Sequence, residues 1–393
     1  MDVASFTKSM KEKAVEIGFD LVGVSPVGSF PESQFYKEWL AKGFAGEMKY
    51  MEREPQKREN IKNVLPGAKS VISCGINYNT DYPYSTEERD KTKGWISRYA
   101  WGDDYHEIVG KKLSLLAGFI SGTLSEDVKS RIYVDTGPVL DRVYGKYSGL
   151  GWFGKNTCLI NQKVGSWIFI GEIVTNIEFD YDSLVPDRCG TCTRCIDACP
   201  TGALLEPYVL DSRLCISYLT IELRQGIPLD LRDNVGNNIY GCDICQDVCP
   251  WNKKAKLSNE SSFQPREGLH NPSLASFSGL TEEDFRLIFK GSPIKRAKRK
   301  GLVRNVLVAM GNSGERDLIP RVKEFLADDD PMVRAHAVWA LWKLEGEDSN
   351  ETLSNLLDAE SDPEVRGEIV AVLKIRDTGC TIQDARCKRQ DTR

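Results

Sequence analysis

Eight of the twelve cysteines in this 393-residue chain lie between residues 189 and 249, at spacings that could place sulfur ligands around a metal centre. Two runs read C-x2-C-x2-C-x3-C-P and C-x2-C-x3-C-P, and one further cysteine lies between them. The eight are Cys189, Cys192, Cys195, Cys199, Cys215, Cys242, Cys245 and Cys249. Thiolates are soft ligands that select zinc or iron–sulfur clusters, so this stretch predicts a metal centre bound through sulfur.

The longer run has the spacing that binds [4Fe–4S] clusters in bacterial ferredoxins, where three cysteines hold one cluster and the fourth reaches a second cluster. The shorter run lacks one cysteine of that pattern. Cys215 replaces it, because it brings the count to the eight ligands that two cubane clusters require. We therefore predict two [4Fe–4S] clusters. The first is held by Cys189, Cys192, Cys195 and Cys249, and the second by Cys199, Cys215, Cys242 and Cys245.

Zinc and disulfides are the alternatives for these cysteines. A zinc site would use two C-x2-C pairs around one tetrahedral ion, which leaves the fused run and the two Cys-Pro endings unexplained. A disulfide framework needs an oxidising compartment, and residues 1–17 contain no apolar segment of a secretory signal. Of the other four cysteines, Cys74 and Cys158 lie in apolar segments and are expected in the core, whereas Cys380 and Cys387 lie in a polar tail.

Overall charge and hydropathy restrict the class of protein. A net charge of −5 argues against a wholly basic nucleic-acid coat, so any contact with nucleic acid has to come from a local patch. No run of about 18 apolar residues is present, which predicts no membrane span. Without a secretory or twin-arginine signal, we expect the chain to act in the cytoplasm, where thiols stay reduced.

Hydrophobic patterning predicts the elements that precede the cysteines. Helical spacing covers Ser5–Ile17 and Tyr105–Leu124. Apolar, β-branched and aromatic runs predict strands at 21–24, Val71–Ile76, Arg131–Asp135 and Trp167–Thr175. Strands mixed with helices favour an α/β or α+β sandwich. No G-x-G-x-x-G follows a strand, so a Rossmann nucleotide site is not supported.

The chain divides into four stretches on these patterns. We expect an α/β domain at residues 1–180, a two-cluster module at 181–260, a helical domain at 275–375 and a polar tail at 376–393. The helical domain contains an internal repeat. Asp330–Arg334 and Asp362–Arg366 both read D-P-x-V-R before an apolar helical run, and 302–304 is a weaker copy. This pattern is typical of HEAT-like helical hairpins, which must stack to bury their apolar faces.

A dense basic run precedes the repeat. Residues 295–300 carry five positive charges in six positions, namely Lys295, Arg296, Lys298, Arg299 and Lys300. Such a run can be no more than a solvated face. Because the chain as a whole is acidic and the run adjoins a helical array, we favour contact with RNA phosphates through counterion release.

Six segments of the chain resemble those of the epoxyqueuosine reductase family. They are 58–70 (RENIKNVLPGAKS), 97–106 (SRYAWGDDYH), 134–138 (VDTGP), 151–159 (GWFGKNTCL), 215–222 (CISYLTIE) and 241–252 (GCDICQDVCPWN). The resemblance extends over essentially the full length, including the C-terminal repeat. It is the combination of segments, rather than any one of them, that is distinctive.

The resemblance implies an α+β multi-domain fold. Its parts are a flavin-reductase-like α/β domain that binds cobalamin, a ferredoxin-like double [4Fe–4S] module and a C-terminal HEAT-like α-helical repeat. Electrons from an external low-potential donor would pass through the two clusters to cobalamin. The reaction would reduce the epoxide of epoxyqueuosine to queuosine, the last step of its biosynthesis, at the wobble position of tRNAs for Asp, Asn, His and Tyr (GUN anticodons). The resemblance also implies a monomer without membrane contact.

Asp135, in the segment VDTGP, is the residue that we expect to donate the proton. An aspartate at the end of an apolar strand and beside a glycine turn is well placed at the mouth of a site. Burial against the corrin face would raise its pKa and suit it to general acid catalysis. The alternative is that Asp135 caps the following turn through its side chain.

Other positions in the family-like segments are candidates for contacting cobalamin, although each could be an ordinary surface residue. The candidate cofactor-binding set is Arg58, Arg98, Asp135, Lys155, Asn156, Ser217, Arg224, Gly241 and Cys242. His106 lacks the D-x-H-x-x-G context of a cobalt-ligating histidine, so we interpret it as structural.

Three other functions remain open on the sequence. A cobalamin-dependent reductive dehalogenase also combines a corrin with two clusters, but such proteins usually carry an export signal and lack HEAT-like repeats. A non-catalytic electron-transfer adaptor would need no corrin. An RNA-binding protein with purely structural clusters would show no redox turnover.

Overall fold

The structure is a computed structural model that describes residues 2–124 and 127–375, so Cys380 and Cys387 lie outside the described residues. The chain forms two compact units. Unit 1 comprises residues 1–87, 98–215 and 243–266, and unit 2 comprises 88–97, 216–242 and the chain from 267 onward. Each unit therefore combines segments that are far apart in the sequence. No helix in the described part of the chain is long and apolar enough to cross a membrane.

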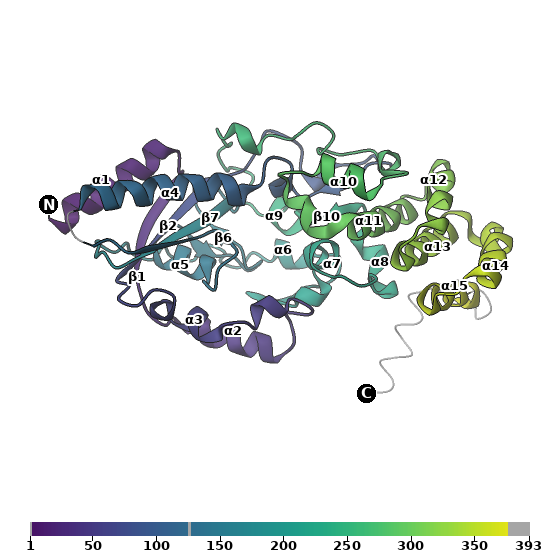
Figure 1. The fold of residues 1–393 in the computed structure, drawn as a ribbon, viewed down its shortest axis with the longest axis horizontal. Helices are drawn as coiled ribbons and strands as arrows, with labels where there is room; N and C mark the ends of the chain where they lie inside the picture. The colour runs from purple at the N-terminus through teal and green to yellow at the C-terminus, as the bar shows by residue number, and fades with distance from the viewer. Residues whose placement is uncertain (1, 125–126, 376–393) are drawn as a thin grey trace. The chain divides into compact units, whose positions relative to one another are not determined.

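Unit 1 is built on a four-stranded sheet in the order β1-β2-β7-β4, in which every neighbouring pair is antiparallel. The strands are β1 (Leu21–Pro26), β2 (Ser70–Asn77), β4 (Ser130–Tyr133) and β7 (Ile168–Thr175). Helices α1 (Val3–Ile17) and α4 (Tyr105–Thr123) cover one face, and α5 (Asp141–Tyr147) covers the other (Figure 1). The predicted combination of helices and strands is confirmed as an α+β arrangement.

Smaller elements complete unit 1. Helices α2 (Pro31–Ala41) and α3 (Pro55–Glu59) follow β1. The two short hairpins pair β5 (Trp152–Phe153) with β6 (Leu159–Ile160) and β8 (Leu204–Glu206) with β9 (Val209–Leu210). Single-turn helices α6 (Arg194–Asp197) and α9 (Ile244–Asp247) carry cysteines of the two runs.

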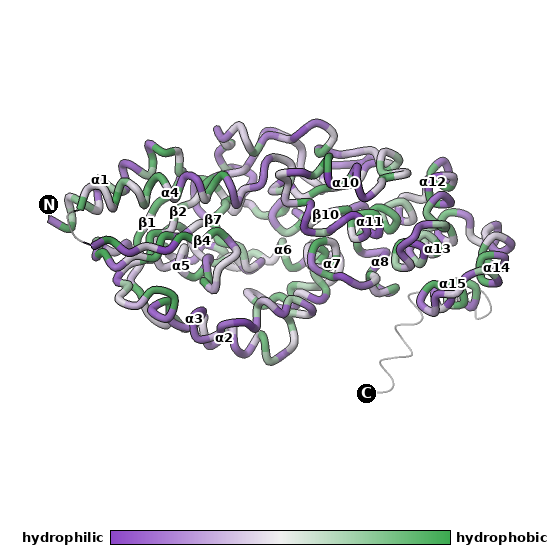
Figure 2. The backbone as a smooth tube through the Cα atoms, in the orientation of Figure 1, coloured by the Kyte–Doolittle hydropathy of each residue, from purple (hydrophilic) through white to green (hydrophobic). Residues whose placement is uncertain are grey.

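The side chains of β7 alternate between two cores, which is why its sequence is apolar on both faces. Phe169 joins the α4 core with Leu113, whereas Val174 joins the α5 core with Tyr144. Gly171 lies beneath α4, and a Cβ there would be 2.7 Å from Leu113 Cδ1, so close packing of this helix on the strand requires glycine. Figure 2 shows hydrophobic segments in the region of the sheet.

The predicted elements of unit 1 are confirmed with shifted ends. Helix α1 starts at Val3, because the Asp2 side chain accepts a hydrogen bond from the Ser5 N–H, and it ends at the left-handed Gly18. Strand β4 ends at Tyr133, although we expected it to continue to Asp135. Asp135 has a φ of 56°, which is incompatible with a strand, so it lies in the turn that follows.

Unit 2 is mainly helical. A short parallel pair joins β3 (Trp95–Ile96) to β10 (Asn238–Tyr240), and α7 (Ile216–Ile221) and α8 (Leu229–Val235) come from the same part of the chain. The remaining helices are α10 (Glu282–Ile288), α11 (Lys298–Ser313), α12 (Ile319–Glu324), α13 (Pro331–Glu345), α14 (Asn350–Ala359) and α15 (Pro363–Ile375). Helices α11, α13 and α15 pack in sequence, as the predicted helical repeat requires (Figure 1).

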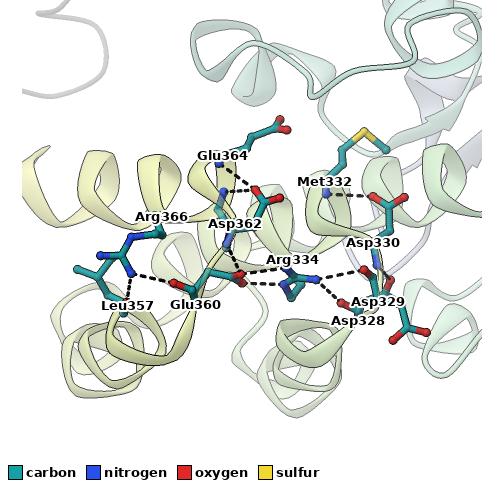
Figure 3. A network of polar contacts seen from close by, with 11 residues as sticks. Asp328, Asp329, Asp330, Met332, Arg334, Leu357, Glu360, Asp362, Glu364 and Arg366 are labelled. Carbon is teal, nitrogen blue, oxygen red and sulfur yellow. Dashed lines mark hydrogen bonds and ion pairs between the residues drawn. The ribbon is translucent and has the colours of Figure 1, made fainter.

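The D-P-x-V-R repeat has a structural role at the start of each hairpin. The side chains of Asp330 and Asp362 accept hydrogen bonds of 3.0 and 2.9 Å from the backbone N–H two residues on, which caps α13 and α15. Arg334 donates to Glu360 at 2.7 Å and to the Asp328 carbonyl at 2.7 Å (Figure 3). Arg334 therefore connects the start of α13 to Glu360, which precedes α15, and links one hairpin to the next.

The two-cluster module that we expected at residues 181–260 is divided between the units. Residues 181–215 and 243–266 belong to unit 1, where the Tyr208 N–H donates to the Lys155 carbonyl at 3.1 Å. Residues 216–242 belong to unit 2, where buried Arg304 donates to the Leu219 and Leu223 carbonyls. These long-range hydrogen bonds assign each segment to its unit.

Candidate functional site

Three cysteines of the predicted first cluster lie together in unit 1. Cys249 is buried in an apolar cluster with Trp152, and Cys189 packs against the same cluster. Burial, followed by the charge of Cys249, raises the pKa of Cys195 to about 11. Burial also raises the thiol pKa of Cys189 and of Cys249. The charge of Asp187 adds to the shift of Cys189, and the charges of Cys189 and Cys158 add to the shift of Cys249. Bare thiolates would be costly here, and bound iron would neutralise them, so the donor set fits a sulfur-ligated cluster.

The members of the predicted second set are divided between the two units. Cys199, Cys215 and Cys245 belong to unit 1, and Cys242 belongs to unit 2. The Cys199 sulfur lies 3.6 Å from Thr201 Oγ1. Among residues 2–124 and 127–375, no three His, Cys, Asp or Glu side chains are grouped around a single metal ion. In a [4Fe–4S] cubane, iron and sulfide alternate at the corners and each cysteine binds a different iron, so the cysteines need not converge on one point. The eight-ligand assignment stays a prediction.

Cys158 differs from its expected place in the core. The residue as a whole is partly exposed. A hydrogen bond with Cys245 lowers the pKa of its thiol to about 7, although burial of the thiol acts in the opposite direction. Asn156, two residues earlier, donates from Nδ2 to the Cys245 carbonyl at 3.4 Å. The segment 151–159 is thus in contact with the second cysteine run. Cys74 is buried in the core, as expected.

Asp135 occupies a tight turn after β4. Its backbone is left-handed, with a φ of 56°, and the Thr136 N–H closes the turn on the Val134 carbonyl at 2.6 Å. Gly137 follows, and a Cβ at that position would lie 2.0 Å from the Tyr133 ring. Such a conformation costs energy in a non-glycine residue and is common at functional sites. The sequence VDTGP therefore forms a tight turn that carries Asp135 at its left-handed position.

The first turn of α4 supplies the partners of that side chain. The Tyr105 hydroxyl donates to Asp135 Oδ2 at 2.6 Å. The Tyr105 ring stacks on Phe169 with a centroid distance of 4.3 Å, which holds the phenol in place. His106 Nε2 lies 4.0 Å from the same Asp135 oxygen, and its Nδ1 lies 2.7 Å from Asp104 Oδ1. From the sequence, we interpreted His106 as structural and did not single out Tyr105, although SRYAWGDDYH was among the segments that carry the resemblance.

The exposure of Asp135 distinguishes its two expected roles. The side chain is 65% exposed, whereas that of Asp104 is 5% exposed. Among the described residues, its carboxylate hydrogen-bonds to Tyr105, not to the backbone of the following turn. The geometry therefore gives no support to a turn cap. It leaves an open carboxylate that a bound cofactor or substrate could cover.

Comparison with known proteins agrees with the resemblance seen in the sequence. Three family models match the chain: "Epoxyqueuosine reductase QueG, DUF1730" at residues 58–136, "4Fe-4S double cluster binding domain" at 188–252 and "HEAT repeats" at 297–374. Epoxyqueuosine reductase from Salmonella typhimurium is 36% identical over 87% of this chain and 89% of its own length. The enzyme of the same name from Synechocystis is 44% identical over 72% of this chain and 98% of its own length. The chain belongs to the epoxyqueuosine reductase family.

Solved structures of this family have the same fold. An epoxyqueuosine reductase crystallised with an epoxyqueuosine-modified tRNA-Tyr stem loop is 31% identical, covers 95% of this chain and 99% of its own, and has a TM-score of 0.88. The Bacillus subtilis epoxyqueuosine reductase, in a structure whose catalytic aspartate loop is swung out of the active site, is 30% identical with a TM-score of 0.87 and covers 95% of this chain and all of its own. As a family member, the chain is an oxidoreductase with a double [4Fe–4S] domain and a HEAT-like repeat.

The candidate cofactor-binding residues of this family member fall in both units. In unit 1, the Arg58 guanidinium donates to the Arg53 and Tyr50 carbonyls, and Lys155 Nζ donates to the Gly190 carbonyl at 2.7 Å. In unit 2, Ser217 lies in α7, and the Gly241 N–H donates to Thr220 Oγ1 at 2.9 Å. Arg224, also in unit 2, donates to the Arg296 carbonyl at 2.8 Å. Their contacts with a cofactor stay predictions.

Arg98 has a different environment from the one expected for a ligand-binding arginine. It is 2% exposed, and its guanidinium donates to the carbonyls of Thr80, Tyr82 and Pro83. Its guanidinium carbon also lies 4.7 Å from the centroid of the Trp101 ring. These contacts favour a structural role, in which Arg98 orders the loop after β2.

The basic run of the reductase lies at the start of α11 and in the 3₁₀ turn before it. Members of the run pair with acidic residues in unit 2. Arg299 pairs with Asp328 at 2.5 Å, Arg296 with Glu222 at 2.8 Å, and Lys300 with an aspartate at 3.2 Å. A groove beside the run is lined by Lys298 and by several carboxylates. The positive charge available to an RNA is therefore smaller than the sequence alone suggests.

Proposed function

We propose that this chain reduces epoxyqueuosine in tRNA to queuosine, with electrons that pass through two [4Fe–4S] clusters to cobalamin. The observation that carries the proposal is the fold: a solved epoxyqueuosine reductase bound to an epoxyqueuosine-modified tRNA-Tyr stem loop superposes on 95% of the chain with a TM-score of 0.88. The substrate would be the wobble nucleoside of tRNAs for Asp, Asn, His and Tyr, with GUN anticodons.

The clusters would carry electrons from an external low-potential donor. The matched double-cluster domain spans residues 188–252 and contains all eight predicted ligands. Cys195 and Cys249, assigned to the first cluster, lie near enough for the charge of one to raise the pKa of the other. Cys215, between the two runs, would be the ligand that completes the second cluster.

Cobalamin, when bound, would supply the reduced metal centre that delivers two electrons to the epoxide. The residues of the chain that fit it in unit 1 are those near the Asp135 turn. An exposed carboxylate beside Tyr105 and His106 offers polar groups next to an uncovered surface. The other residues that we propose as cofactor contacts, on the resemblance alone, are Arg58, Lys155, Asn156, Ser217, Arg224, Gly241 and Cys242.

Asp135 would donate the proton that the leaving epoxide oxygen takes. Conversion of the epoxide to an alkene and water consumes two electrons and two protons. The chain places a carboxyl group, held by the Tyr105 hydroxyl at 2.6 Å, on a turn after β4. In a structure of the Bacillus subtilis relative, with a TM-score of 0.87 to this chain, a catalytic loop named by its aspartate is swung out of the active site. A turn of this kind could place or withdraw Asp135 in the same way.

The test is an anaerobic incubation of the purified chain with cobalamin, a strong reductant and tRNA that carries epoxyqueuosine, followed by mass analysis of the nucleosides. Loss of one oxygen atom from the nucleoside, dependent on added cobalamin, is the expected result. Turnover without any bound corrin, or absence of turnover with clusters and cobalamin both loaded, would overturn the proposal. Absorbance spectra of the protein with added cobalamin distinguish an adaptor, which would bind no corrin.

A further inference from the structure

A tryptophan in unit 1 carries a buried hydrogen-bond donor that lacks an acceptor. Trp152 is 1% exposed, and its indole Nε1 is enclosed without a hydrogen-bond partner among the described residues. An N–H group loses its hydrogen bonds to water when it is enclosed, which costs free energy unless an acceptor replaces them. The missing acceptor is therefore to be sought in a group that the protein binds at this place.

The neighbours of Trp152 are cysteines of the predicted first cluster. Trp152 shares an apolar cluster of side chains with Cys249 and Ile160, and Cys189 packs against the same side chains. Burial raises the thiol pKa of Cys189, and the Trp152 indole opposes that shift as a donor, although no hydrogen bond joins it to a protein acceptor. Sulfur atoms bound to iron accept hydrogen bonds, so an iron–sulfur cluster held by these cysteines would supply the missing acceptor.

The hairpin of β5 and β6 holds the indole in place. Trp152 in β5 is the register partner of Ile160 in β6. The two strands approach so closely that a Cβ at Gly151 would lie 2.1 Å from the Ile160 carbonyl oxygen. The Trp251 ring meets the Trp152 ring edge to face, with a centroid distance of 5.1 Å. Close packing on both sides therefore leaves the indole little freedom to reach another acceptor.

Trp167 and Trp339 also have a buried indole N–H without a partner among the described residues, but their surroundings differ. The ring of Trp167 lies 5.3 Å from the guanidinium carbon of Arg98, and that of Trp339 lies 5.5 Å from the guanidinium carbon of Arg232. A cation over the ring offsets part of the cost of burying the indole. Trp152 has no such cation in the described part of the chain, and it is the one that packs with predicted cluster ligands.

We propose that the Trp152 indole N–H donates a hydrogen bond to a sulfur atom of the first iron–sulfur cluster, either Cys189 Sγ or a sulfide, and thereby raises the reduction potential of that cluster. Reduction adds negative charge to the sulfur atoms, so a donor stabilises the reduced state more than the oxidised state. The cluster is then easier for an external donor to reduce. This inference rests on the proposed assignment of Cys189 and Cys249 to one cluster, and it does not require epoxide reduction.

The first test is a redox titration of the full chain with both clusters loaded, followed by electron paramagnetic resonance. Trp152→Phe keeps an aromatic ring and removes the N–H. At a fixed potential, the ratio of reduced to oxidised protein should fall about tenfold for one of the two clusters, which corresponds to a potential about 59 mV lower for a one-electron couple. Trp251→Phe is the matched control, because Trp251 packs in the same apolar cluster and is partly exposed. An unchanged potential in Trp152→Phe, or an equal shift in Trp251→Phe, would overturn the proposal.

The second test detects the hydrogen bond itself. Electron–nuclear double resonance of the reduced protein, with an isotopic nitrogen label in the indole rings, should show a coupling between the cluster and an indole nitrogen. Heavy water should remove the coupling of the matching proton. Trp251→Phe should retain the nitrogen coupling and Trp152→Phe should lose it. Absence of the coupling in the wild type contradicts the proposal, and this result stands even if Trp152→Phe does not retain its iron.

Failure of this inference differs from failure of the proposed function. A wild type that reduces the epoxide but shows no indole coupling disproves the role of Trp152 alone. A wild type with both clusters and cobalamin loaded that leaves the epoxide intact disproves the proposed function, while the potential and the coupling still report on the indole.

Discussion

The Tyr105 hydroxyl donates to the Asp135 carboxylate at 2.6 Å, across a sequence separation of 30 residues. Tyr105 comes from the first turn of α4, and Asp135 from the turn after β4. The phenol ring is fixed by stacking on Phe169. The hydrogen bond therefore sets the direction of the proposed proton donor, although neither residue is rigid by itself.

Tyr105→Phe should lower turnover about tenfold, because a hydrogen bond to a charged group contributes about 1.5 kcal/mol to the orientation of its acceptor. Iron content and thermal stability should stay near those of the wild type, since the ring and its stacking are kept. Tyr181→Phe is the control: its exposed hydroxyl donates to the Lys69 carbonyl at 3.1 Å. Equal rates for Tyr105→Phe and wild type would show that the hydrogen bond does not position Asp135 for catalysis.

Asp135→Asn should retain cobalamin binding but lower turnover by on the order of 10²-fold or more, because the amide keeps the size and has no transferable acidic proton. Cobalamin titration by absorbance and nucleoside analysis measure the two effects separately. Normal turnover would remove Asp135 from the mechanism. Joint loss of binding and turnover would instead make it a structural part of the pocket.

Cys215→Ala should lose one cluster, so iron per chain should fall toward half, because the assignment needs eight thiolates. Cys158→Ala is a strict control, since this thiol hydrogen-bonds to Cys245 and yet is not an assigned ligand. Cys380→Ala is a second control. Full iron content in Cys215→Ala, or loss of iron in Cys158→Ala, would require a different set of ligands.

Replacement of Lys295 and Lys298 by alanine should weaken tRNA binding and flatten its salt dependence, with a slope change of about 0.7–0.9 for each phosphate that is no longer neutralised. Arg299→Ala should act differently. Its side chain is 16% exposed and pairs with Asp328, whose side chain is 7% exposed, so its removal should reduce stability by about 1–3 kcal/mol.

Binding curves at several salt concentrations and denaturant unfolding distinguish the two effects. The rate at saturating tRNA should not change in the double lysine variant. An unchanged affinity and salt slope would show that the basic run is a solvated face, and would shift attention to the helical repeat.

His336 should make the folded state sensitive to acid. Its Nδ1 contacts the Met332 carbonyl at 2.8 Å and its Nε2 accepts from the Ile227 N–H at 3.1 Å, which requires the neutral ring. Burial, and then the charges of Arg232 and Arg304, lower its pKa well below 6.5. Below about pH 6.5, His336 therefore binds a proton in the unfolded state but stays neutral in the folded state. Its contribution to the free energy of unfolding is complete above that pH and is lost as the pH falls.

The free energy of unfolding should fall by up to about 1.4 kcal/mol per pH unit below about pH 6.5 through this one residue. His336→Gln should remove that slope while it lowers stability at neutral pH. Denaturant unfolding of both proteins between about pH 5 and 7.5 measures the difference, and other titrating groups cancel in the comparison. If the plots of unfolding free energy against pH were parallel for the two proteins, His336 would have the same protonation state in the folded and unfolded protein.

Local patterns in the sequence determined much of this protein. The cysteine spacing identified the double-cluster segment, because ligand number and order are chemical requirements that do not depend on the rest of the fold. The D-P-x-V-R repeat identified the helical hairpins, since Asp330 and Asp362 cap their own helices within two residues. Runs of apolar, β-branched and aromatic residues located β2 and β7, because each strand packs against helices on both faces.

Only the tertiary structure decided which polar residues meet. Asp135 was recognised from its segment, but its partner Tyr105 comes from another element, and its left-handed backbone ended β4 early. In the sequence, Glu172 is a single acidic residue within an apolar strand. In the structure it is fully buried, and burial, followed by the charge of Asp141 at the start of α5, raises its pKa well above the ordinary value. Sequence patterns report the neighbours that are close along the chain, whereas burial and ion pairs depend on residues that only folding brings together.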